Sequence, residues 1–511
     1  PAIDSDGDGI YDVIDNCPFA FNPSQGDADF DKIGNICDQE FRLEQTYGGS
    51  SNDEGRAMQQ TSDDGFIIAG QTTSFGSRLW DIYLVKTGIS GNKLWEKTFG
   101  GGGLDLGFSI QQTTDGGFVI AGQTTSSGLT AGENDAYVIK TDSSGNKLWE
   151  KTFGGTNNDY GESVQQTMDG GYIIAGYTYS FGSGGSDVYL IKTDSSGNKQ
   201  WEKTFGGSND DYGYSIQQTS DGGYIFVGAT IFDFSTDVWL VKTDSVGNKQ
   251  WEKMFGNLFD IGNSVQQTTD GGYIIVGTTS SAAGSDIWLI KTDSLGNKLW
   301  EKIFHNLYDQ GNDVQQTTDD GYIVIGSTSN DVWLIKTDSI GNKQWERTFG
   351  NPASDRLESG YSVQQTTDGG YILVGTTNSG VGAFDVWLIK TDSIGSEQWE
   401  KTFGGLSEDV GFSVQQTTDG GFIIAGYTYS FGAGHADVWL IKVGDILDAC
   451  RILNKPYKKY TLTKDVNSAG TCFTIGADNI FLDCAGYSIT GNGLGAGIFS
   501  ENKKNITIKN C

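Results

Sequence analysis

Apolar and polar residues follow a pattern along most of the chain that repeats about every 50 residues. One unit, residues 215–256, contains four runs of strand length that are separated by Gly, Asp or Asn. We expect strands at 215–219, 224–230, 237–243 and 249–255. The Asp-Gly-Gly and Ser-Val-Gly-Asn stretches between them supply the residues that tight turns need.

The second and third predicted strands are apolar on both faces. Val238 and Leu240 lie on one face, and Trp239 and Val241 on the other. Strands of this kind need cover on both sides. A single four-stranded meander cannot provide that cover, but copies packed face to face around an axis can, and that arrangement is a β-propeller.

Counting the copies predicts a closed ring of eight. A Gln-Gln pair marks eight units, with first residues Gln59, Gln111, Gln165, Gln217, Gln266, Gln315, Gln364 and Gln415. The third strand also occurs eight times, but the Trp-Glu-Lys fourth strand occurs only seven times. The missing copy matches Leu43-Glu-Gln-Thr-Tyr-Gly-Gly near the N-terminus, so this segment is predicted to complete the eighth blade. An open array would need polar capping repeats instead.

These units resemble a group of secreted bacterial and archaeal propeller repeats with the pattern DGGYIIVG, DVWLIKTD and GNKxWEKTFGG. The resemblance covers about residues 41–443. It implies an extracellular, all-β, eight-bladed propeller with four-stranded blades, and it implies no defined activity.

The first 40 residues contain the spacing of a calcium-binding loop. Oxygen ligands at positions 1, 3, 5, 7, 9 and 12 of a twelve-residue loop, with Gly at position 6, suit Ca²⁺. The carboxylates and the backbone carbonyl of position 7 come from Asp4, Asp6, Asp8, Ile10, Asp12 and Asp15. The alternative is an acidic disordered linker.

The residues that follow, from Asp15-Asn-Cys-Pro to Cys37-Asp38, resemble a thrombospondin type 3 repeat. The resemblance implies a disulfide between Cys17 and Cys37 and a second calcium site. Its ligands would be Asp27, Asp29, Asp31, Ile33 and Asp38, with Asp15 shared between the sites. Lys32 and Asn35 stand where the family has Gly and Asp, which weakens the second site.

Residues 444–511 change character to short β-rich stretches. These stretches and the step Leu482-Asp-Cys-Ala-Gly resemble the opening coils of a pectate-lyase-like right-handed β-helix. Cys450 with Cys472, and Cys484 with Cys511, are plausible disulfides. The fold includes polysaccharide lyases, but no lyase constellation of Arg, Lys and Asp is visible here. Because an uncovered β-helix end invites strand addition, we expect further coils or another molecule to cover it.

Composition and charge narrow the setting. The chain has 511 residues and a net charge of −31, which disfavours nucleic acid and anionic lipid and suits divalent cations. No apolar run is long enough for a transmembrane helix. The six cysteines lie outside the repeats and favour an oxidising compartment, and the first residue, Pro1, is consistent with a removed leader. Secretion to the cell surface is therefore expected.

Candidate chemistry is sparse, and we expect no enzymatic activity. His305 and His435 lack a nucleophile motif. Every connection from a fourth strand to the next first strand carries an acid, and these acids are expected on one face of the ring. They are Asp53, Asp105, Asp159, Asp211, Asp260, Asp309, Glu358 and Asp409. Loops with aromatics share that face, so the face could bind sugars or cations. These aromatics are in Tyr177-Thr-Tyr-Ser-Phe-Gly, Tyr427-Thr-Tyr-Ser-Phe-Gly, Phe232 and Phe234. Alternatively, each acid caps its own turn.

Three functions remain open from the sequence. The first is an extracellular structural or adhesive calcium-binding protein that joins itself, as a homopolymer or filament, or joins other cell-envelope components. The second is a carbohydrate-binding module that uses the acid and aromatic face. The third is a part of a longer polysaccharide-active enzyme.

Overall fold

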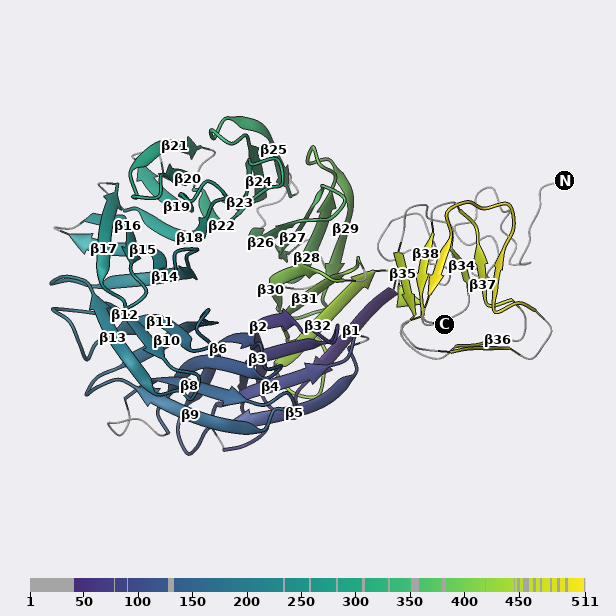
Figure 1. The fold of residues 1–511 in the computed structure, drawn as a ribbon, viewed down its shortest axis with the longest axis horizontal. Helices are drawn as coiled ribbons and strands as arrows, with labels where there is room; N and C mark the ends of the chain where they lie inside the picture. Colours follow the sequence, from purple (N-terminus) through teal and green to yellow (C-terminus); the bar gives the residue numbers. More distant parts are fainter. Residues whose placement is uncertain are drawn as a thin grey trace.

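The repeats fold into eight four-stranded antiparallel blades arranged as a ring (Figure 1). The computed structural model describes residues 41–511 except 78, 90, 127–132, 233–234, 257–258, 282–283, 306–307, 330, 351–357, 379–382, 419, 445, 448–450, 454–458, 463–465, 469–470, 478–479, 485–487, 492–494 and 510. All regular elements of this part of the chain are β-strands. The predicted calcium ligands and the Cys17–Cys37 pair lie in residues 1–40, outside the described residues.

The strands are described by their position in the blade, from blade 1 to blade 8. First strands are β2 (Asp53–Gln60), β6 (Asp105–Gln112), β10 (Asp159–Gln166), β14 (Asp211–Gln218), β18 (Ile261–Gln267), β22 (Gln310–Gln316), β26 (Ser359–Gln365) and β30 (Asp409–Gln416). Second strands are β3 (Phe66–Thr72), β7 (Phe118–Thr124), β11 (Tyr172–Thr178), β15 (Tyr224–Phe232), β19 (Tyr273–Ser281), β23 (Tyr322–Thr328), β27 (Tyr371–Thr377) and β31 (Phe422–Thr428). Third strands are β4 (Asp81–Thr87), β8 (Asp135–Thr141), β12 (Asp187–Thr193), β16 (Ser235–Thr243), β20 (Gly284–Thr292), β24 (Asp331–Thr337), β28 (Asp385–Thr391) and β32 (Asp437–Gly444). Fourth strands are β5 (Lys93–Phe99), β9 (Lys147–Phe153), β13 (Lys199–Phe205), β17 (Lys249–Phe255), β21 (Lys298–Phe304), β25 (Lys343–Phe349), β29 (Glu397–Phe403) and, for blade 8, β1 (Phe41–Tyr47).

The predicted N-terminal strand closure is confirmed. β1 pairs antiparallel with β32, from Phe41 opposite Gly444 to Tyr47 opposite Val438. Blade 8 therefore has the sheet order β1-β32-β31-β30, with its outermost strand taken from the opposite end of the repeat array. Backbone hydrogen bonds between the two ends of the array hold the ring shut.

The predicted start of the first strand is wrong by four residues. β14 begins at Asp211, whereas the sequence pattern placed its start at residue 215. A β-bulge between Gly213 and Ser215 lets β14 stay paired with β15 as far as Asp211 opposite Thr230. The bulge breaks the alternation of polar and apolar residues that marks a strand in the sequence.

The core lies between the blades, because the second and third strands are buried on both faces. Leu240 packs with Tyr273 and Ile275 of blade 5. Its neighbour Trp239 packs with Ile173 of blade 3. Full burial of one such side chain contributes about 1.5–3 kcal/mol, and apolar clusters of this kind fill all eight seams between blades.

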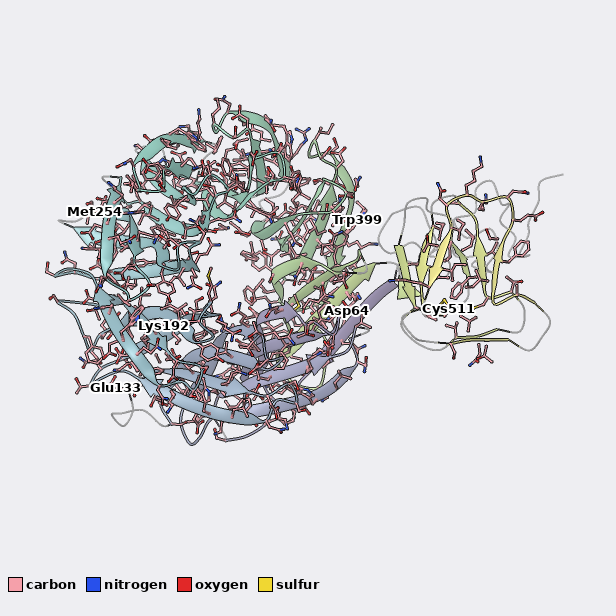
Figure 2. The ribbon with its side chains drawn as sticks, in the orientation of Figure 1. Asp64, Glu133, Lys192, Met254, Trp399 and Cys511 are labelled. Carbon is pink, nitrogen blue, oxygen red and sulfur yellow. A yellow bond between two sulfur atoms is a disulfide. The ribbon has the colours of Figure 1, made fainter. Side chains whose placement is uncertain are left out.

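An aromatic pair also crosses seven of the seams. The fourth-strand Trp contacts the ring that opens the second strand of the next blade, as in Trp201 with Tyr224 at 6.0 Å and Trp399 with Phe422 at 5.7 Å. Figure 2 labels Trp399 on blade 7. At the closing seam Leu43 stands in the Trp position. The contacts there include the Tyr47 hydroxyl, which donates to the Gly91 carbonyl at 2.5 Å, and Lys442 Nζ, which lies 5.6 Å from the centre of a phenyl ring in blade 1.

The Gln-Gln pairs join neighbouring blades by hydrogen bonds. The side-chain oxygen of each first Gln accepts the backbone N–H of the second Gln of the next blade, as in Gln217 and Gln267 at 2.7 Å. This bond occurs at all eight seams, with distances from 2.5 to 3.4 Å, and the last one joins Gln415 to Gln60. The repeated polar residues thus form a closed ring of inter-blade hydrogen bonds.

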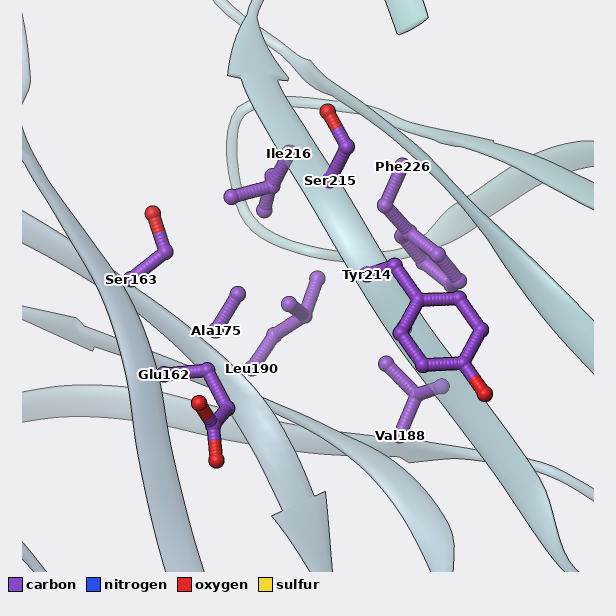
Figure 3. A pocket seen from close by; sticks show the side chains of 10 residues that line it. Glu162, Ser163, Ala175, Val188, Leu190, Tyr214, Ser215, Ile216 and Phe226 are labelled. Atoms are coloured by element: carbon purple, nitrogen blue, oxygen red, sulfur yellow. The ribbon is translucent and has the colours of Figure 1, made fainter. Parts of the chain in front are cut away.

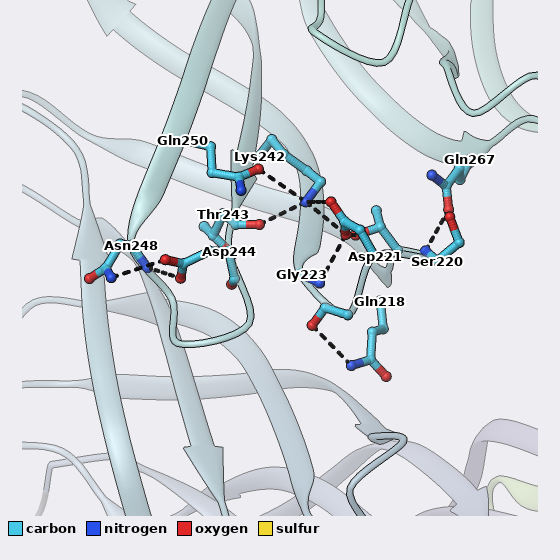
Figure 4. A network of polar contacts seen from close by, with 12 residues as sticks. Gln218, Ser220, Asp221, Gly223, Lys242, Thr243, Asp244, Asn248, Gln250 and Gln267 are labelled. Carbon is cyan, nitrogen blue, oxygen red and sulfur yellow. Dashed lines mark hydrogen bonds and ion pairs between the residues drawn. The ribbon is translucent and has the colours of Figure 1, made fainter.

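A buried lysine links the third strand to the turn after the first strand (Figure 4). In blade 4 the Lys242 side chain is 3% exposed, lies 2.9 Å from Asp221 Oδ2 and donates to the Thr243 carbonyl at 2.8 Å. Asp221 also accepts hydrogen bonds from Thr219 and Gly223. The same clamp forms in seven blades, through Lys86, Lys140, Lys192, Lys242, Lys291, Lys336 and Lys390.

Residues 446–509 build parallel ladders of very short strands. One ladder contains β33 (Ile446–Leu447), β35 (Lys459–Leu462), β38 (Phe481–Asp483) and β41 (Thr507–Lys509). A second contains β34 (Arg451–Leu453), β37 (Phe473–Ile475) and β40 (Ile498–Ser500), and a third pairs β36 (Val466–Ser468) with β39 (Ile489–Gly491). Side chains such as Leu462, Phe473 and Leu482 form a separate small core.

One predicted disulfide of this region is present. Cys484 and Cys511 are bonded, with their Cα atoms 4.7 Å apart. Cys472 is also in a disulfide. Its predicted partner, Cys450, lies outside the described residues.

Ring closure predicts a distinct response to changes in β1. Tyr47→Ala removes a buried ring and its hydrogen bond from the closing seam, so we expect the free energy of unfolding to fall by about 3–5 kcal/mol. β1 is paired with β32, which lies at the opposite end of the repeat array. In the Tyr47→Ala variant, limited proteolysis should therefore cut the N-terminal segment at temperatures well below the midpoint of thermal unfolding. Phe255→Ala, at the equivalent position of β17, is the matched control and should unfold in one step without early cleavage. Identical proteolysis of the two variants would contradict closure through β1.

The lysine clamps predict acid sensitivity. Partial burial alone would raise the pKa of Asp221, but hydrogen bonds from Thr219, Lys242 and Gly223 lower that pKa to about 2. The clamp's contribution is therefore complete above about pH 4, the unfolded value, and is lost as the pH falls through about 2. Asp221→Asn should cost about 1 kcal/mol at pH 6, since solvent screens the half-exposed carboxylate, and should flatten the decline between pH 4 and 2. Tryptophan fluorescence reports unfolding of the variant and of the unmodified chain, at pH 6 and during an acid titration. Identical acid titrations of the two proteins would contradict the clamp.

Candidate functional site

The first strands start, and the second strands end, on the same face of the propeller, which we call the loop face. It consists of the connections into the first strands, such as 154–158, and the loops after the second strands, such as 179–186. Backbone hydrogen bonds join the two sets, as from Tyr179 N–H to the Asn158 carbonyl at 2.9 Å and from Tyr429 N–H to the Glu408 carbonyl at 3.0 Å. The expectation that both sets of loops share a face is confirmed.

The eight acids expected on this face are buried, with exposed fractions between 0 and 3%. Asp159 shows their common role. Its Oδ1 accepts the Thr178 hydroxyl, and its Oδ2 accepts the Ser180 hydroxyl at 2.6 Å and the Gly155 N–H at 2.8 Å. These contacts match the alternative that the sequence left open, in which each acid caps its own turn, and the buried acids do not form an exposed acidic surface. This set is Asp53, Asp105, Asp159, Asp211, Asp260, Asp309, Glu358 and Asp409.

The exposed chemistry of the loop face is aromatic. Tyr177 at the end of β11 stacks on Tyr160 of β10, with ring centres 4.4 Å apart. It also meets Tyr179 at 6.2 Å and Tyr212 of the next blade at 6.0 Å. Tyr214 follows along β14, 6.2 Å from Tyr212. We call these five side chains the tyrosine cluster.

The tyrosine cluster is accessible and carries polar edges. Tyr214 is 51% exposed and Tyr179 is 42% exposed. Burial raises the pKa of Tyr177, so its hydroxyl stays neutral at physiological pH and serves as a hydrogen-bond donor or acceptor. Asn134 Nδ2 lies 3.4 Å from the Tyr160 hydroxyl, which places an amide beside the rings. Aromatic faces beside amides and hydroxyls match the two sides of a sugar ring.

A hollow lies beside the tyrosine cluster between blades 3 and 4 (Figure 3). Glu162 of β10 and Tyr214 of β14 flank it, and Leu190 and Phe226 are among its apolar lining residues. Burial raises the pKa of Glu162, and the charge of Arg56 in blade 1 opposes that rise. The hollow joins an apolar floor to one acidic group, and its volume of about 10 Å³ is room for about one water molecule.

A second aromatic group lies on blades 7 and 8. Phe412 of β30 lies 6.4 Å from Tyr361 of β26 and 5.8 Å from Tyr427 of β31. Tyr427 donates to Glu408 at 3.0 Å and meets Tyr429, which is 40% exposed, at 5.6 Å. The loop face thus presents aromatic residues at two separate places.

Sequence reasoning found only part of these groups. The motifs Tyr177-Thr-Tyr and Tyr427-Thr-Tyr were noted, but Tyr160, Tyr212 and Tyr214 were not. An aromatic residue one or three positions after the acid that opens a first strand is the signal that could have found them. Phe232, also noted from the sequence, ends β15, and its side chain and Phe234 lie outside the described residues.

The histidines sit apart from the tyrosine cluster. His435 is exposed. His305 is 66% exposed, and its Nδ1 lies 2.9 Å from Asp286 Oδ1. In the described part of the chain no group of three or more His, Cys, Asp or Glu side chains could hold a metal ion.

Comparison with known proteins adds little to this description. No family model matches the chain. Over 134 residues it is 27% identical to the regulatory protein FlaEY of Caulobacter vibrioides, a match that covers 24% of this chain and 14% of FlaEY. Sqt1 from Chaetomium thermophilum is similar in structure, with 12% identity, a TM-score of 0.47, and coverage of 78% of this chain and 99% of Sqt1. Puromycin hydrolase has 12% identity and a TM-score of 0.43, over 74% of this chain and 59% of its own.

One Sqt1 structure shows that protein bound to the N-terminus of the ribosomal protein L10. Similarities of this strength carry no argument about function here. Among the described residues, no helix has the length and apolar content needed to cross a membrane.

Proposed function

We propose that this protein is an extracellular, non-enzymatic adhesive protein whose propeller is a rigid recognition head. The observation that carries the proposal is the tyrosine cluster, an exposed aromatic surface. It lies on a closed propeller whose neighbouring blades are joined by hydrogen bonds. The closed propeller keeps the tyrosine side chains of two neighbouring blades in fixed positions, so little conformational entropy is lost on binding. The expected ligand is carbohydrate, because neutral phenols and amides line the same surface as the exposed rings.

The flanking regions complete the proposal. The spacing of Asp4 to Asp15 supports calcium binding in residues 1–40. The short parallel ladders of 446–509 are typical of a right-handed parallel β-helix, which supports the resemblance in that region. The edge strands of such ladders are places where a further strand of this chain, of a second copy or of an envelope component would add.

The carbohydrate ligand is tested by replacing the exposed rings. We expect a glycan array to show binding to a defined set of sugars, and Tyr214→Ala and Tyr179→Ala each to weaken it about tenfold or more, as for an aromatic hot spot. Leu148→Ala is the matched control, because Leu148 is 57% exposed but lies on β9, outside the tyrosine cluster. An array without hits, or tyrosine variants that bind as well as the control, would dismiss carbohydrate recognition.

The adhesive, self-joining role is tested by microscopy. With calcium, negative-stain images at high protein concentration should show particles joined end to end, and a chelator should disperse them. The calcium segment is expected to lose order when the ion is removed, because it contains little apolar material. Strictly single particles with calcium at high concentration would exclude the homopolymer.

A further inference from the structure

A second set of acids faces the first across every seam. These acids open or lie near the start of the third strands, and they are Asp81, Asp135, Asp187, Asp237, Asp286, Asp331, Asp385 and Asp437. The backbone brings each one beside the acid of the next blade. For example, the Asp409 N–H donates to the Phe384 carbonyl at 2.6 Å, which places Asp385 of blade 7 next to Asp409 of blade 8.

At five seams the two carboxylates meet at a glycine that follows the fourth strand, namely Gly48, Gly100, Gly154, Gly206 and Gly350. A Cβ built on Gly100 would lie 2.2 Å from Asp81 Oδ1 and 2.5 Å from Asp105 Oδ2. At Gly48 the corresponding distances are 2.1 Å to Asp437 Oδ1 and 2.5 Å to the oxygen of its partner acid. Only glycine leaves room for both oxygens, so the sequence keeps two buried carboxylates close together at these seams.

Such a pair is costly unless something positive lies between its members. Asp385 is 2% exposed, and its Oδ1 accepts no hydrogen bond from the described residues. Burial and, next, the charge of Asp409 raise the pKa of Asp385 to about 7. Burial and the facing acid also raise the pKa of Asp81 and of Asp437.

The seam between blades 5 and 6 shows what satisfies such a pair. His305 stands there in the position that glycine takes at the other seams. Its imidazole reaches the acid of the third strand, with Nδ1 2.9 Å from Asp286 Oδ1. At this seam the chain supplies a basic group of its own to the buried acids.

We propose that the glycine-bearing seams each bind a calcium ion between the two carboxylates, and that His305 replaces the ion at the seam between blades 5 and 6. Because the described residues offer no group of three acidic, His or Cys ligands, the remaining ligands are backbone and hydroxyl oxygens and water. Two carboxylates per ion place the affinity in the weak range of extracellular modules, about 10⁻⁴–10⁻³ M. These sites lie in the propeller and are separate from the predicted calcium loops of residues 1–40.

The number of bound ions tests this directly in the full chain. Equilibrium dialysis against radioactive calcium at several millimolar should show three fewer ions per chain for the triple variant Asp81→Asn, Asp385→Asn, Asp437→Asn. His305→Gly should bind one ion more. Asp392→Asn, at the other end of β28, where Oδ1 caps a turn through Ile394 N–H at 3.0 Å, should bind the same number as the unmodified chain. The loops of residues 1–40 contribute equally to all variants.

Thermal melting distinguishes two explanations of the paired carboxylates, namely that they bind calcium or that they share a proton. In chelator the triple variant should melt higher than the unmodified chain, because it has lost the carboxylate repulsion, and calcium should reverse that order. An unchanged ion count in both the triple variant and His305→Gly overturns the proposal. So does a triple variant that melts higher by the same amount with and without calcium, since the acids would then hold a proton instead.

Discussion

The structure depends on strands that are apolar on both faces. A blade with two such strands has no stable surface of its own, and each copy added to a row buries one face and exposes another. The only arrangement of identical blades without an exposed apolar end is a closed ring. Pairing of β1 with β32 provides that closure and also ties the two ends of the repeat array by backbone hydrogen bonds.

Closure also explains why so many polar groups can be buried. Gln217, Lys242 and Asp211 each find their partners within the blade or across one seam, and the same partners recur around the ring. Charged and polar residues therefore form the turns and the contacts between blades in a chain whose net charge is −31. The same arrangement brings pairs of buried carboxylates close together at the seams, as at Gly48 and Gly100.

The fold could be predicted from the sequence because its signals are local and repeated. The period of the Gln-Gln pairs counted the blades, and the match of Leu43-Glu-Gln-Thr-Tyr to the Trp-Glu-Lys strands identified the closing strand. The start of the first strand could not be predicted, since the bulge at Gly213 hides the alternation there.

The candidate site could be predicted less well because it combines residues from neighbouring blades. Tyr177 and Tyr212 are distant in sequence, and no single repeat shows that their rings meet. Burial of the Asp159 set was also hidden, because an acid that caps a turn and an acid that faces solvent have the same spacing in the sequence. Only the contacts with Thr178 and Ser180 distinguish the two roles.

Hydrogen exchange measured by mass spectrometry on the full chain tests the central claim, that the ring is closed by its N-terminal strand. If β1 is an integral fourth strand, the amides of residues 41–47 should exchange as slowly as those of 249–255 in β17, and both should open with the same free energy. Exchange of 41–47 at the rate of an unpaired segment, with β17 still protected, would contradict it.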